Sequence, residues 1–146
     1  MSLPAGTTLQ DAISGISALL RSVSGIRAAP EYPSDQINAF PTVIIRAWSG
    51  SYEADPFGGG SGAKKGLHDV AVEVHFARKG APYDVKLAMR YSDAIPAALL
   101  ADPTLGGKAD TFARIRYTFG DMEKYTGTPT VGWLFIVEGI KQEVDL

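Results

Sequence analysis

Strict alternation of side chains over residues 67–78 constrains the fold more than any other feature. Four apolar residues alternate there with three polar residues and an alanine: Val70, Val72, Val74 and Phe76 against Asp69, Ala71, Glu73 and His75. Because successive side chains of a β-strand point to opposite faces, this period of two predicts a strand with one buried and one solvated face. Such a strand needs a sheet that another layer covers on one side.

A first helix is expected at residues 8–24. Its apolar residues recur at steps of three and four: Leu9, Ile13, Ile16, Leu20 and Val23. This spacing is typical of one buried stripe of an amphipathic helix. Thr7 or Thr8 can cap its start, with Gln10 or Asp11 three residues later as the reciprocal partner.

A second helix begins near Pro82, a residue that is favoured in a first turn. Its apolar side runs from Val85 to Leu99. Pro96 lacks an N–H group for the carbonyl of Ser92, so the helix is expected to kink, or to break in two, near residues 94–95.

Three more segments have strand character, at residues 42–48, 111–119 and 130–141, and a short strand is possible at 26–29. The 130–141 segment is apolar on both faces for several residues, which predicts a central or covered strand. The expected fold class is therefore α+β, a mostly antiparallel sheet with two main helices packed on one side. With 146 residues, the chain fits one domain.

A glycine-rich loop, residues 49–66, is expected between two of these strands. It is too long for a tight hairpin turn, and loops of this length usually have a function or are disordered. The sequence therefore predicts a projecting flexible arm that contacts a partner. The candidate contact residues are Phe57, Gly58, Gly59, Gly60, Lys64 and Lys65. Phe57 is equally compatible with packing inside the loop itself.

Composition excludes several function classes. The chain has no cysteine, which rules out a disulfide framework, a thiolate zinc site and a cysteine nucleophile. The formal charge of −2 offers no overall basic bias for binding DNA. No window approaches 18 consecutive apolar residues, so we expect no membrane span. The N-terminus, Met1 to Gly6, lacks a basic leader followed by a long apolar segment, so we expect no export by a standard signal.

No catalytic, cofactor or metal site is expected. The glycines of the loop precede a strand pattern, whereas a phosphate-binding loop must open a helix. His68 and His75 should point to opposite faces of one strand. Asp69 and Glu73 share a face with His75 but lack recognisable ligand spacing. Arg114 and Arg116, on one face of another strand, are more typical of solvated or paired charges than of a phosphate site. We therefore expect that the protein is not an enzyme.

The order of elements resembles that of the tail-terminator and tail-completion (neck) proteins of long-tailed bacteriophages and phage-like particles. Four phrases strengthen the resemblance: Tyr-Pro-Ser-Asp at 32–35, Asp-Pro-Thr-Leu-Gly-Gly at 102–107, Tyr-Thr-Gly at 125–127 and Gly-Trp-Leu-Phe at 132–135. Pro96 departs from the continuous second helix that such proteins are expected to have.

The resemblance implies a structural virion protein that assembles in the cytoplasm of the bacterial host. A homohexameric ring would cap the tail tube, stop its polymerisation and present an interface to the head connector. Its partners would be other copies of itself, the tail tube protein and the head–tail connector or stopper protein, with DNA only in transit through the channel. Two alternatives are a head–tail stopper or connector protein and a small ligand-binding or enzymatic α+β domain.

Overall fold

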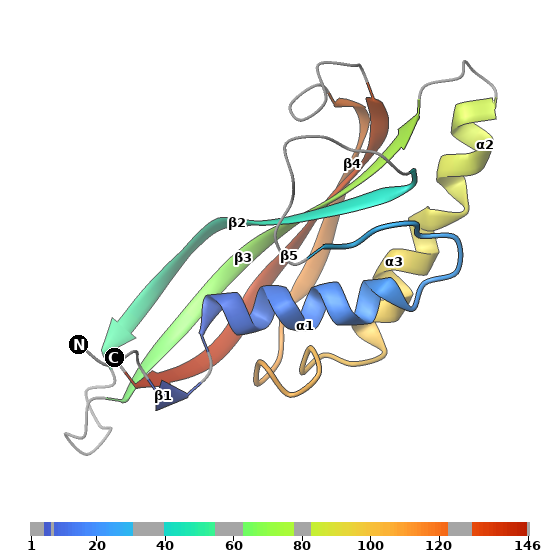
Figure 1. Ribbon diagram of the computed structural model, residues 1–146. Coiled ribbons are helices and arrows are strands. Elements are labelled where there is room, and N and C mark those ends of the chain that lie inside the picture. The colour runs from blue at the N-terminus through green and yellow to red at the C-terminus, as the bar shows by residue number, and fades with distance from the viewer. Residues whose placement is uncertain are drawn as a thin grey trace.

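Five antiparallel strands form one sheet (Figure 1). The structure is a computed structural model that describes residues 5–6, 8–30, 40–54, 63–77, 83–122 and 130–145. The long strands are β2 (Thr42–Ala54), β3 (Ala63–Ala77) and β5 (Thr130–Asp145), with β3 in the middle. The other side of β5 pairs first with β4 (Arg114–Met122) and further along with the short β1 (Ala5–Gly6). The predicted central position of the last strand is confirmed.

Three helices cover one side of the sheet, here called the helix face: α1 (Leu9–Arg21), α2 (Tyr83–Met89) and α3 (Tyr91–Leu100). The alternating residues of β3 supply the centre of the core between the two layers, together with every second residue of β2 and β5. The fully buried members include Val43, Val70, Val72, Val74, Phe76, Phe135, Ile16, Leu20, Ile95 and Leu99. The predicted α+β class and the one-sided helices are confirmed.

The start of α1 follows the sequence prediction. Thr8 is the N-cap, its hydroxyl accepts a hydrogen bond from the Asp11 backbone at 3.3 Å, and Asp11 Oδ2 accepts one from the Thr8 backbone at 2.8 Å. This reciprocal pair satisfies two backbone donors that a helix start leaves free. The helix ends at Arg21, three residues earlier than expected.

The expected break in the second helical segment lies elsewhere. Arg90 separates α2 from α3, and Pro96 is inside α3 without ending it. The indole Nε1 of Trp133 donates to the Ala88 carbonyl at 2.8 Å, and the Ser92 hydroxyl donates to the Met89 carbonyl at 2.8 Å. Side chains therefore occupy carbonyls that a continuous helix would use, and the prediction of a break at residues 94–95 was wrong.

The ladder is irregular at Asp69. Trp48 on β2 and one residue at Glu138–Gly139 on β5 have no counterpart on β3, so both neighbours of β3 carry a bulge. Asp69 holds both bulges: its Oδ2 accepts from the Ser49 hydroxyl at 3.0 Å and its Oδ1 from the Gly139 backbone at 3.0 Å. Because the bulges lie on its neighbours, β3 keeps its alternation throughout.

The strands around the glycine-rich loop are longer than the sequence indicated. Residues 49–54 belong to β2 and residues 63–66 to β3, and Ala54 pairs with Lys64. The expected flexible arm at 49–66 is therefore wrong at both ends, because ladder hydrogen bonds extend across those residues. Residues 55–62 lie outside the described part of the chain. The possible strand at 26–29 is a single parallel bridge, from Ala28 to Thr42.

Candidate functional site

The partner-contact residues expected from sequence are not gathered into one described site. Phe57, Gly58, Gly59 and Gly60 lie outside the described residues. Lys64 and Lys65 are on the paired strand β3 and not in an unpaired loop, and their contact with a partner stays a prediction. In the ladder, Lys65 stands between Glu53 of β2 and Glu143 of β5. Cross-strand pairs of opposite charge stabilise a sheet, which gives Lys65 a structural role in its own chain.

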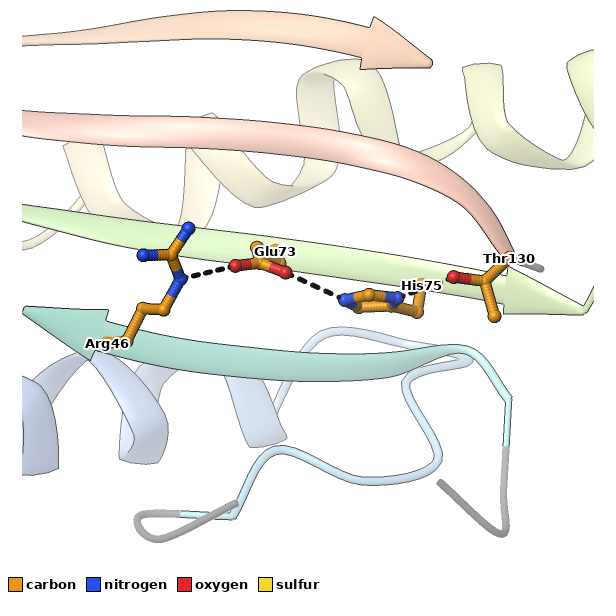
Figure 2. A network of polar contacts seen from close by, with 4 residues as sticks. All are labelled: Arg46, Glu73, His75 and Thr130. Atoms are coloured by element: carbon orange, nitrogen blue, oxygen red, sulfur yellow. Dashed lines mark hydrogen bonds and ion pairs between the residues drawn. The ribbon is translucent and has the colours of Figure 1, made fainter. Parts of the chain in front are cut away.

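A chain of polar side chains crosses the face of the sheet that the helices leave free, here called the opposite face (Figure 2). Arg46 Nε donates to Glu73 Oε2 at 2.5 Å, Glu73 Oε1 lies 3.0 Å from His75 Nε2, and His75 Nδ1 lies 2.8 Å from Thr130 Oγ1. We name these four residues the polar chain. Glu73 and His75 are buried, so the solvated face that alternation predicted for β3 was wrong there. Their polar atoms satisfy one another in place of water.

The electrostatics of the polar chain favour an ionised Glu73. Burial raises the pKa of Glu73, but hydrogen bonds from His75 and Arg46 and the charge of Arg46 outweigh it, so this pKa lies below its usual value. An ionised Glu73 is paired with a proton on His75 Nε2, and the other ring nitrogen, Nδ1, shares a hydrogen bond with the Thr130 hydroxyl.

The polar chain has the connectivity of a hydrolase triad, because a hydroxyl, an imidazole and a carboxylate are joined in order. A nucleophile must reach its substrate, however, and Thr130 is only 2% exposed. The arrangement therefore suits a structural role better than catalysis. Among the described residues, no group of three or more histidine and acidic side chains is placed to hold a metal ion. Both carboxylate oxygens of Asp69 accept hydrogen bonds at the two bulges, from Ser49 and Gly139.

Residues 102–107, which carry part of the family resemblance, form a self-contained loop. Thr104 Oγ1 donates to Asp102 Oδ1 at 2.6 Å, and the Gly106 backbone donates to Asp102 Oδ2 at 3.1 Å. The hydrogen bond from Thr104 lowers the pKa of Asp102. Leu105, Gly106 and Gly107 all have positive φ, which only the two glycines adopt without strain. The Leu105 side chain is buried against the core and anchors the loop.

Exposed aromatic side chains gather on the edge strand β4. Tyr117 is 69% exposed and Phe119 is 37% exposed, both on the helix face. Their rings lie 5.6 Å and 4.8 Å from that of Trp133, at T-shaped and tilted angles. Large exposed apolar side chains in a cluster are typical of a protein interaction surface. Alternation in the sequence indicated their shared face but not their exposure, because it does not tell an edge strand from a central one.

The opposite face of β4 carries two arginines around one carboxylate. Arg114 Nε and Arg116 Nε donate to Glu138 Oε1 at 2.9 Å and 2.6 Å. Both arginine side chains are largely exposed, whereas Glu138 is mostly covered. Two cations share one anion, so this cluster of three residues keeps a net positive charge.

The outer half of β2 is exposed on both faces. Every residue from Ala47 to Glu53 is exposed, including Tyr52 at 54%. Among the described strands, β2 pairs only with β3, and β4 pairs only with β5. Their free edges present backbone N–H and C=O groups that another strand can pair with. Sequence reasoning placed most of this half of β2 in the loop, so it missed this surface.

No protein-family model matches this sequence, and no curated protein matches it significantly. No helix in the described part of the chain combines the length and the apolar character that a membrane span requires.

Proposed function

We propose that this chain is a structural tail-terminator protein of a long-tailed bacteriophage or a phage-like particle. In this proposal six copies form a ring on the head-proximal end of the tail tube. The ring stops tube polymerisation and offers the head connector its docking surface. The chain acts in the virion neck by contact alone, with no bond made or broken.

The observation that carries the proposal is that, among the described strands, β2 and β4 each have an unpaired edge and carry different side chains. A ring of identical subunits needs heterologous contacts, in which one patch of each copy meets a different patch of the next. β2 and β4 supply two such patches, at opposite edges of the sheet. Both edges are exposed next to large aromatic side chains, Tyr52 on β2 and Tyr117 on β4.

The sealed polar chain also favours a structural role. Arg46, Glu73, His75 and Thr130 use their polar atoms on one another, and three of the four are buried. Such networks give a sheet a single well-defined arrangement when every member is satisfied. A rigid sheet suits a subunit whose edges must meet those of its neighbours at one fixed angle.

Overall charge agrees with DNA passing through the ring without being held. The formal charge of −2 gives the subunit no general attraction for phosphates. The two arginines of β4 share Glu138, which offsets part of their charge.

Light scattering at several concentrations, with negative-stain images of the purified protein, tests this function. We expect rings with a central channel that bind the ends of tail tubes. Rings that bind portal complexes and leave tube ends bare would identify a stopper or connector protein of the neck. A monomer at every concentration, with a small molecule bound, would favour a ligand-binding domain and overturn the proposal.

A further inference from the structure

We infer that β4 of one copy receives the outer half of β2 of the next copy as an added antiparallel strand. This inference rests on the proposed ring and names the surfaces that close it. The occupant of the β4 edge is thus a second copy of this chain. Three observations carry the inference: the relative direction of the edges, their exposure and the chemistry of the side chains along them.

Strand direction makes the two edges compatible. Each neighbouring pair from β2 through β3 and β5 to β4 is antiparallel, so β4 runs opposite to β2. If β2 of a second copy pairs antiparallel with β4, the second copy has the same orientation as the first. Repeating this step gives subunits that are related by one rotation, which is the condition for a closed ring.

Neither edge is blunted by proline, by lysine or by very short length, although β2 has its bulge at Trp48. Natural edge strands are blunted by proline, lysine or very short length. β2 has 13 residues and β4 has 9, and neither contains a proline or a lysine. The exposed half of β2 runs from Ala47 to Glu53, beyond the Ala28 bridge that covers the beginning of this strand. An open strand without such protection is suited to adding another strand.

One register matches the side chains on both faces. Tyr52 lies on the helix face with Gly66 and His68, and Glu53 lies on the opposite face. On β4, Tyr117 lies on the helix face and Arg116 on the opposite face. If Tyr52 stands opposite Tyr117 of the neighbour, Glu53 stands opposite Arg116. Aromatic side chains then meet on one face and opposite charges on the other, which are both favourable cross-strand pairs.

The same register staggers the copies. Tyr52 is level with Gln142 of β5 through Gly66, whereas Tyr117 is level with Phe135. Each added copy is therefore displaced along the strand direction. A sheet that closes on itself requires tilted strands and such a stagger in register, so the displacement agrees with closure.

Disulfide trapping tests the inference directly, because the chain contains no cysteine of its own. We expect the double variant E53C/R116C, oxidised after assembly, to give a ladder of covalent species up to the full ring on a non-reducing gel. The matched control E53C/K86C uses an exposed lysine on α2, which is on neither edge strand, and should give no ladder. Both single cysteine variants should also give none.

The outcomes separate this inference from the proposed function. Rings that form but give no E53C/R116C ladder overturn the edge pairing and leave the ring intact. Failure of the unmodified protein to assemble at any concentration, alone or with tail tubes, overturns both.

Charge exchange gives a second test that needs no oxidation. We expect E53R and R116E each to raise the concentration for half-assembly by about fivefold per contact, since a cross-strand charge pair contributes up to about that factor. The double variant E53R/R116E should recover part of this loss; the part that comes from the chain's own pairs with Lys65 and Glu138 is not recovered. K86E should leave assembly unchanged. Additive losses without rescue in the double variant would contradict the proposed register.

Discussion

The indole of Trp133 holds the Ala88 carbonyl at 2.8 Å, where the second helical segment divides into α2 and α3. This bond joins the sheet to the helical layer, because Trp133 is on β5 and Ala88 on α2. Both residues belong to the buried core. The same indole is the ring against which Tyr117 and Phe119 pack.

Replacing Trp133 with phenylalanine should lower the free energy of unfolding by about 1–3 kcal/mol. The substitution keeps an aromatic ring but leaves the buried Ala88 carbonyl without its donor. Urea denaturation measures the change, and W48F, at an exposed tryptophan, is the control and should shift it by less than about 0.5 kcal/mol. If W133F and W48F lowered the free energy of unfolding equally, the hydrogen bond from Trp133 to the Ala88 carbonyl would not contribute to stability.

Gly15→Ala should destabilise the protein although alanine is the better helix former. A Cβ at Gly15 would come within van der Waals overlap of the Leu105 carbonyl oxygen, in the loop that packs on α1. Forced overlap in a packed core costs about 1–3 kcal/mol, more than the helix propensity gained. Gly120→Ala is the matched control, since nothing lies within 4 Å of a Cβ there. Thermal melting of the two variants and of the unmodified protein tests this prediction. A melting temperature of Gly15→Ala above that of the unmodified protein would contradict the close contact with Leu105.

Glu73→Gln should weaken the fold at neutral pH and have little effect in strong acid. Hydrogen bonds from His75 and Arg46 hold the pKa of Glu73 below its usual value in the folded state, so its carboxylate stabilises the fold above the unfolded pKa. That contribution is lost as the pH falls through the folded pKa. Urea titrations of both proteins between pH 7 and pH 2 measure this. A difference in stability that stays constant over this range would show that ionised Glu73 contributes nothing.

His68 should make the protein less stable as the pH falls below about 6.5. Burial lowers the pKa of His68, although the Asp69 carboxylate opposes this. The unfolded chain therefore binds a proton first, and stability declines as the pH falls from the unfolded pKa through the folded one. The His68 Nε2 atom is buried and has no hydrogen-bond partner among the described residues.

A titration of the His68 ring by NMR checks this sign, with His68→Gln as the variant that removes the dependence. A ring that titrates above 6.5 in the folded protein would reverse the expected direction.

Sequence periodicity was sufficient for the elements that depend on local pattern. Residues three apart limited the cap of α1 to Thr7 or Thr8, and the structure has Thr8. Apolar side chains on both faces of β5 predicted a central or covered strand, and the structure has it between β3 and β4. The break at Arg90 could not be predicted in the same way. It coincides with a hydrogen bond from Trp133, which lies 45 positions from Ala88 in the sequence.

The candidate surfaces were not predicted either, because they too depend on which strands are neighbours in the sheet. Alternation shows that Tyr117 and Phe119 share a face, but it does not show that β4 has no neighbour beyond β5 among the described strands. Likewise, the sequence pattern of Glu73 and His75 is that of solvated residues. Their hydrogen-bond partners, Arg46 and Thr130, lie on other strands, so the pattern does not show that the two residues are buried.

The length of tail tubes tests the central claim most directly. The tail tube protein of the same particle is polymerised with and without this chain, and the tubes are measured by electron microscopy. Our account predicts shorter tubes that carry a six-fold ring at one end. Tubes of unchanged length with bare ends, while the chain stays in solution, would contradict it.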